Sequence, residues 1–287
     1  MASAASTRAR LEFAALALAL LIALGAFAPA AVASEYVALG DSYTSGPFIP
    51  QAIPPWGCLK SDHNYAHLAA PRLGLTLEDR SCNGAHTDNM TRSQAVWPEP
   101  NPAQFDALDS GTRLVTLGIG GNDIDFAGIA LSCVSLTRSD ASPCMDRYTA
   151  GGIDQISRRI ADTGPKVAGV LQAIHARAPS ARVLVVNYPA IFPGRGPGCF
   201  PQLPVADGDV PWLRNKEKEL NRMLAVEAAA NGASLVNRYR ASLRHDACEL
   251  PGVRWLEPVL PASPALPIHP NLAGMTAAAD LVVAAAD

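Results

Sequence analysis

Several patterns that point to metal or nucleic-acid binding are missing from this 287-residue sequence. It contains no C-x2-C pair, the usual spacing of ligands in a structural zinc site. His63 and His67 are four residues apart but are not part of an H-E-x-x-H segment, so we interpret them as one helix face and predict no metal. Lysine and arginine form no stripe and the formal net charge is only −3, so nucleic acid is not an expected partner.

Long apolar runs are also missing, except for one at the N-terminus. Arg8 and Arg10 precede an apolar stretch from Phe13 to Phe27, and Ala31-Val32-Ala33 has small residues where export signals are cleaved. We therefore predict a signal peptide over residues 1–33 and a secreted protein. The alternative is an uncleaved membrane anchor, but the continuous run is short for a span of about 20 residues. The mature chain is not expected to insert stably into a membrane.

The sequence does contain six cysteines, all beyond the predicted signal peptide. An even number of cysteines in an exported chain indicates disulfide bonds, and six allow fifteen pairings. The least entangled pairing joins neighbours along the chain and is the one we predict: Cys58–Cys82, Cys133–Cys144 and Cys199–Cys248. Because all six cysteines can pair, a thiol nucleophile is not expected.

Short apolar runs alternate with helical patterns over residues 34–287, which predicts one α/β domain with a parallel sheet and helices on both faces. The predicted strands are 36–39, 75–80, 113–117, 182–187 and 234–237. The predicted helices are 64–73, 212–231, 271–286 and one that Gly164-Pro165 opens and Pro179 stops.

Residues able to perform acyl transfer follow the predicted strands. Ligands of open parallel sheets bind outside the carboxyl ends of the strands. Ser42, Gly84 and Asn122 follow the first three strands, and His269 precedes the last helix. A serine hydroxyl needs a base, so we predict Ser42 as nucleophile and His269 as base. The backbone N–H groups of Ser42 and Gly84 and the side-chain amide of Asn122 are the predicted oxyanion-hole donors.

These residues occur in four ordered segments: Gly40-Asp41-Ser42, Cys82-Asn83-Gly84, Gly120-Gly121-Asn122-Asp123 and His269-Pro270-Asn271. The segments resemble the SGNH (GDSL) hydrolase superfamily, which is named for its Ser, Gly, Asn and His. The six cysteines and the loop-rich inserts further resemble the secreted actinobacterial lipases and esterases of that superfamily. The resemblance implies a flavodoxin-like, three-layer αβα sandwich with a central five-stranded parallel sheet, an ester hydrolase activity and no cofactor.

One position departs from the superfamily pattern. An Asp usually stands three residues before the His, but this sequence has Leu266 there. Some secreted members resemble this arrangement and orient the histidine with a main-chain carbonyl. The resemblance therefore implies a Ser42–His269 dyad oriented by the carbonyl of Leu266, and a carboxylate from elsewhere, such as Glu257, is the alternative.

The sequence says less about the substrate than about the reaction. The leading hypothesis is hydrolysis of lipid or other acyl esters by a monomer, and the apolar loop Phe48–Trp56 is either a wall for the acyl chain or ordinary loop packing. A polysaccharide acetylesterase is the second hypothesis, because the same fold supports it. A secreted binding protein with a weak catalytic site is the third, prompted by the missing Asp.

Overall fold

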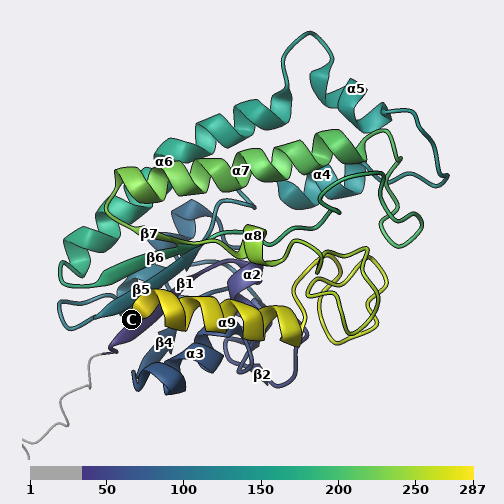
Figure 1. Cartoon of the computed structure of the whole chain (residues 1–287). Coiled ribbons are helices and arrows are strands. Elements are labelled where there is room, and N and C mark those ends of the chain that lie inside the picture. The colour runs from purple at the N-terminus through teal and green to yellow at the C-terminus, as the bar shows by residue number, and fades with distance from the viewer. Residues whose placement is uncertain (1–33) are drawn as a thin grey trace, which may run out of the picture. The chain divides into compact units, whose positions relative to one another are not determined.

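The core of the structure is a sheet of five parallel strands in the order β4-β1-β5-β6-β7 (Figure 1). This computed structural model describes residues 34–287, which form one compact unit. The strands are β1 (Tyr36–Gly40), β4 (Leu77–Asp79), β5 (Leu114–Gly118), β6 (Arg182–Val186) and β7 (Ser234–Val236). Each lies within a predicted strand or differs from it by one residue at an end, and the expected α/β fold is confirmed.

Two helices cover each face of the sheet, which gives three layers (Figure 1). Helices α6 (Gln155–Arg177) and α7 (Val210–Ala230) pack together on one face, and α3 (Tyr65–Leu73) and α9 (Leu272–Ala286) pack together on the other. Successive side chains of a strand point to opposite faces, so Val37 and Leu39 join the core under α6 and α7. Tyr36 and Ala38 join the core beside α3 and α9.

The structure corrects the predicted start of one helix. Gly164-Pro165 does not open a helix but lies inside α6, which begins nine residues earlier at Gln155. Asp154 is the N-cap, and its carboxylate accepts the backbone N–H groups of Ile156 and Ser157. The prediction placed Pro165 in the first turn of a helix, where proline is favoured. In the structure Pro165 lies in the interior of α6, a position that proline seldom occupies. The capping Asp154 was the better start signal in the sequence.

The connections between the main elements contain short helices and one small antiparallel pair. These are α2 (Ser42–Ser45), β2 (Ala52–Ile53), η1 (Trp56–Cys58), β3 (Lys60–Ser61), η2 (Thr87–Met90), η3 (Gln104–Ala107), α4 (Phe126–Ser132), α5 (Pro143–Thr149) and α8 (Arg238–Ala241). Within residues 34–287, no helix has the length and hydropathy that a membrane crossing requires.

Three disulfides fasten these connections. They join Cys58 to Cys82, Cys133 to Cys144 and Cys199 to Cys248, which is the sequential pairing, and residues 34–287 contain no free cysteine. The predicted signal peptide, residues 1–33, lies outside the described residues.

Candidate active site

Ser42 lies where β1 ends and the short helix α2 begins. Asp41 caps α2 by accepting the backbone N–H of Tyr43 (2.9 Å), and its own N–H donates to the carbonyl of Gly118 at the end of β5 (2.9 Å). Gly40 allows this close approach, because a β-carbon there would come 2.5 Å from the Gly118 oxygen. The turn therefore holds Ser42 at the carboxyl edge of the sheet, between the ends of β1 and β5.

His269 reaches Ser42 from the segment that precedes α9. Its Nε2 lies 2.8 Å from Ser42 Oγ, although the two residues are 227 positions apart in the sequence. Only 6% of Ser42 and 9% of His269 is exposed, so the contact is largely shielded from water. The imidazole ring lies 4.6 Å from the Tyr43 ring, centroid to centroid, which supports it from the side of α2. This serine–histidine contact is the arrangement that a nucleophile and its base require.

The carbonyl that orients the imidazole is that of Pro267, one residue later than the predicted Leu266. His269 Nδ1 lies 2.8 Å from the Pro267 oxygen. The Leu266 oxygen instead accepts the backbone N–H of His269 (3.1 Å), because residues 266–269 form a turn. A carbonyl oxygen only accepts, so Nδ1 carries the proton and Nε2 is left free to accept the hydroxyl proton of Ser42.

Glu257 lies close to the histidine in the fold but is directed elsewhere. Its carboxylate accepts hydrogen bonds from Arg254, Asn271 and the backbone of Ala262, and it is fully buried. Its backbone N–H donates to the carbonyl of His269 (3.0 Å). Glu257 therefore fixes the segment that carries His269 and does not supply a charge to Nδ1, which rests on the Pro267 oxygen.

The histidine is neutral under ordinary conditions because it is buried. Removal from water lowers the pKa of His269 to about 4, and the bond to the Pro267 carbonyl only partly opposes this effect. A neutral imidazole is the form that can accept a proton, so the side chain is in the state that a general base needs at neutral pH.

The predicted oxyanion-hole segments are joined directly to one another. Asn122 follows β5, and its Nδ2 donates one hydrogen bond to the carbonyl of Ala85 (2.8 Å), the residue after Gly84. Gly84 has φ of 76°, a conformation that glycine adopts readily. A second bond runs from the Thr87 hydroxyl to Asp123 (2.6 Å). Hydrogen bonds therefore hold the segments after β4 and β5 together.

Two backbone donors in this region have no protein acceptor. Among residues 34–287, the N–H groups of Ser42 and Gly84 donate to no other protein group. Asn122 uses one of its two amide hydrogens for Ala85, which leaves the other available. They are the three groups named as donors from the sequence, and their role in an oxyanion hole stays a prediction.

Sequence reasoning missed several residues that support the site. Gln104 bonds both the N–H and the carbonyl of Gly40 (2.7 and 2.9 Å), and Tyr43 donates its hydroxyl to the carbonyl of Ile268 (2.6 Å), next to His269. Tyr188 lies two positions after β6 and bonds Asp41. Residues just after the carboxyl ends of parallel strands are candidates for a site, and considering those after β6 as well would have indicated Tyr188.

The chain is also similar to known proteins. Residues 38–277 match the GDSL-like lipase/acylhydrolase family. The sequence is 42% identical over 246 residues to Lipase 2 of Streptomyces coelicolor, an alignment that covers 84% of this chain and 81% of that protein.

Two solved structures are also similar. Phospholipase A1 from Streptomyces albidoflavus has a TM-score of 0.71 and 28% identity, with 88% of this chain and 99% of that chain covered. The extracellular lipase from Streptomyces rimosus has a TM-score of 0.67 and 27% identity, with 89% and 100% covered. The chain therefore belongs to the GDSL-like lipase/acylhydrolase family and is a carboxylic ester hydrolase.

Proposed function

We propose that Ser42 and His269 hydrolyse esters as a dyad. Ser42 Oγ attacks the ester carbonyl carbon while its proton passes to His269 Nε2, and the resulting oxyanion is stabilised by the N–H groups of Ser42 and Gly84 and the amide of Asn122. When the intermediate collapses, the alcohol leaves with the proton from His269. Water then attacks the acyl-enzyme in the same way and releases the acid. The 2.8 Å contact between Ser42 Oγ and His269 Nε2 carries this proposal.

The Pro267 carbonyl takes the place of the third triad member in this mechanism. It holds the imidazole in the tautomer that leaves Nε2 free, which is the orienting part of a carboxylate's role. It carries no full negative charge, so it stabilises the imidazolium less than a carboxylate would. The site relies correspondingly more on the oxyanion donors.

The substrates we infer are lipid esters. Lipase 2 of Streptomyces coelicolor, the phospholipase A1 and the extracellular lipase described above are among the similar proteins. The loop after the nucleophile supports the same class, because Phe48 and Trp56 are 56% and 52% exposed while Ile49 packs in the core. Beside the Asn122 segment, Thr87, Met90, Phe105 and Val170 help to line a hollow of about 600 Å³. An exposed apolar loop directly after the nucleophile can form a wall for an acyl chain.

We also propose that the chain acts outside the cell as a monomer, after removal of residues 1–33. Three disulfides in residues 34–287 suit an oxidising compartment. The similar lipase of Streptomyces rimosus is described as extracellular. The mass of the secreted protein, measured intact, tests this boundary: the expected product begins at Ser34.

The decisive experiment replaces the nucleophile and compares substrates. Ser42→Ala should abolish hydrolysis of p-nitrophenyl esters at every chain length and leave thermal unfolding unchanged. Ser45→Ala is the matched control, because it removes another buried serine hydroxyl from α2. Activity of Ser42→Ala equal to that of the unmodified enzyme would disprove the nucleophile assignment.

The same assay separates the substrate classes. A series of esters from acetyl to long acyl, with acetylated xylan alongside, should show preference for acyl chains longer than acetyl. Preference for acetyl esters and release of acetate from xylan would favour the acetylesterase. Binding of esters without hydrolysis would favour the binding protein.

A further inference from the structure

The hydroxyl of Tyr188 joins two segments of the active site that come from different strands. Tyr188 follows β6, is almost fully buried, and donates its hydroxyl hydrogen to Asp41 Oδ2 (2.5 Å). The same oxygen accepts the backbone N–H of Gly121 (2.7 Å). One side chain thus bonds the residue before Ser42 and the residue before Asn122.

These two bonds belong to a longer line of hydrogen bonds. Asp41 uses its other carboxylate oxygen to cap α2, at the N–H of Tyr43. On the far side, Asn122 follows Gly121 and donates to the carbonyl of Ala85. The line therefore runs from the nucleophile turn through Tyr188 to Asn122, and from there to the segment of Gly84.

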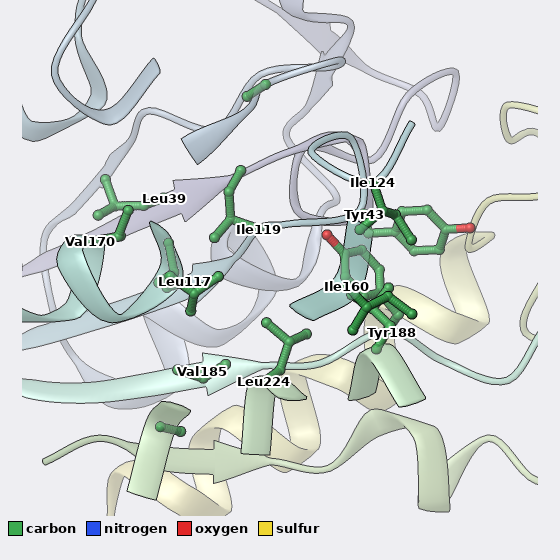
Figure 2. Packing of buried hydrophobic residues seen from close by; sticks show 14 of the residues in the cluster. Leu39, Tyr43, Leu117, Ile119, Ile124, Ile160, Val170, Val185, Tyr188 and Leu224 are labelled. Carbon is green, nitrogen blue, oxygen red and sulfur yellow. The ribbon is translucent and has the colours of Figure 1, made fainter. Parts of the chain in front are cut away.

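Tyr188 is itself held firmly. Its backbone N–H donates to Asn221 Oδ1 on α7 (2.9 Å), and its ring packs edge-on against the Tyr43 ring with centroids 5.0 Å apart. Figure 2 shows the two rings adjacent, with their hydroxyl groups directed to different sides. A β-carbon on Gly121 would lie 2.9 Å from the Tyr188 hydroxyl, so the contact also depends on a glycine there.

We propose that Tyr188 is a positioning residue: its hydroxyl fixes Gly121 and Asn122 relative to Ser42, so that the free N–H of Asn122 points at the oxyanion. This inference rests on the proposed function of Ser42 and Asn122. Oxyanion donors act through their alignment, and misplacement of a group by about 1 Å can cost about a hundredfold in rate. Tyr188 reaches no reacting atom, and its effect passes through Asn122.

A buried tyrosine hydroxyl can also serve stability alone, and the chain offers a control for that role. Tyr36 in β1 is fully buried and shares a hydrogen bond with the Thr116 hydroxyl (3.0 Å). Tyr36→Phe removes a buried, bonded hydroxyl from the core without touching the oxyanion donors. We expect it to lower the unfolding temperature and to leave kcat unchanged.

Tyr188→Phe should lower kcat for a p-nitrophenyl ester by about ten- to a hundredfold, with KM nearly unchanged. A trifluoromethyl ketone adds to the serine to form an anionic tetrahedral adduct, so its affinity should fall in parallel with kcat/KM. A stability role would move neither value. A variant that differs from Tyr36→Phe in neither kcat nor inhibitor affinity would overturn the proposal.

A double-mutant cycle tests the route through Asn122. If Tyr188 acts by aligning that amide, Tyr188→Phe should have less than a threefold effect on kcat in an Asn122→Ala background, because no donor is left to align. Fully additive losses would overturn the proposal. If Tyr188→Phe does not fold, Asp41→Asn disturbs the same hydroxyl, and the same cycle with Asn122→Ala decides.

These outcomes are separable from a failure of the proposed function. If Ser42→Ala retains activity, the proposed function fails, whatever Tyr188→Phe does. If Ser42→Ala is inactive and Tyr188→Phe matches the unmodified enzyme, only the role of Tyr188 is wrong.

Discussion

His269 has a carbonyl on Nδ1 where many serine hydrolases have a carboxylate. Because burial lowers its pKa to about 4, the ring stays neutral as pH falls through the ordinary histidine range. We expect protonation of His269 to lower kcat/KM only below about pH 5, whereas protonation of Asp41, whose pKa burial raises to about 7, can change kcat/KM at higher pH. The measurement is a pH profile of kcat/KM with an ester that does not ionise.

The control for this profile is Glu257→Gln. It neutralises the buried carboxylate that the sequence suggested as a partner, and it keeps an oxygen for Arg254. The pH at which kcat/KM declines on the acid side should be the same as in the unmodified enzyme. The variant should nevertheless unfold at a lower temperature. A fall in kcat/KM near pH 6.5 that persists in Asp41→Asn, where residue 41 no longer titrates, would contradict the buried, carboxylate-free histidine.

Asn122 is expected to contribute through one amide hydrogen. Asn122→Ala should lower kcat by about 10²–10³, the usual effect of losing one oxyanion donor. KM should change little, because the interaction strengthens in the transition state. Steady-state kinetics with a p-nitrophenyl ester provide the measurement, and a loss below about tenfold would argue against this donor.

The sequence could predict the contact between Ser42 and His269 but not how the backbone turns beside the histidine. Ser42, Gly84 and Asn122 follow three strands whose carboxyl ends share one edge of the sheet. The choice between the carbonyls of Leu266 and Pro267 depends on a local turn in which Ile268 has φ of 61°. That conformation is uncommon for a β-branched residue, so no propensity could have indicated it.

At the scale of elements, the Cys58–Cys82 disulfide supports the segment that carries Gly84. The N–H of Cys82 donates to the Gly40 carbonyl, and the N–H of Asn83 donates to the Cys58 carbonyl (both 3.0 Å). Replacement of both cysteines by serine should therefore loosen Gly84 as well as destabilise the fold. We expect a loss of about 3–4 kcal/mol of unfolding free energy and a drop in kcat of about tenfold or more, measured by urea unfolding and by kinetics under native conditions.

The Cys199–Cys248 disulfide is the matched control. It closes a span of 49 residues, whereas Cys58–Cys82 closes a span of 24. Because a longer closed span restricts the unfolded chain more, loss of Cys199–Cys248 should destabilise the fold at least as much. It joins connections away from Gly84, so kcat of the folded variant should change less than twofold. Equal losses of kcat in the two variants would mean that the Cys58–Cys82 bond has no special role in the site.

Helices and strands could be predicted where their buried positions show in the sequence as a clear apolar pattern. The three central strands, β1, β5 and β6, are short runs that are mostly apolar and buried on both faces, and the sequence pattern indicates them directly. Helices α4 and α5 were not predicted, because each is only seven residues long and shows no sustained apolar stripe. The start of α6 was wrong because Pro165 was given more weight than the cap at Asp154.

At the scale of the whole molecule, two buried carboxyl groups make stability depend on pH. Burial raises the pKa of Asp41 to about 7 and that of Glu217 to about 8, although hydrogen bonds to each carboxylate partly oppose this. The folded state therefore holds protons that the unfolded chain releases, and stability falls as pH rises between the unfolded and folded pKa values. His269 has the opposite effect between pH 4 and 6.5.

Because two groups outweigh one, we expect the unfolding free energy to be highest near pH 5 and to fall by a few kcal/mol by pH 8. Below about pH 4.5, carboxylates with lowered pKa values, such as Asp79 and Glu257, become protonated in the unfolded chain and stability falls again. Urea unfolding at pH 5, 6.5 and 8 measures this dependence. Stability that rises steadily from pH 5 to 8 would contradict it.

Glu217→Gln isolates one of the two groups. Glu217 Oε1 accepts the backbone N–H of Ile191 (2.6 Å), and a glutamine oxygen can accept the same bond without titrating. The unfolding free energy of the variant should then fall less between pH 5 and 8, because only Asp41 and His269 still contribute to the change. The difference in unfolding free energy between the variant and the unmodified enzyme should therefore shift in favour of the variant as pH rises. An unchanged slope would show that Glu217 is not the group that binds the proton. Activity should follow the unmodified enzyme at pH 6.5, because Glu217 supports the connection after β6 and is not hydrogen-bonded to Ser42 or His269.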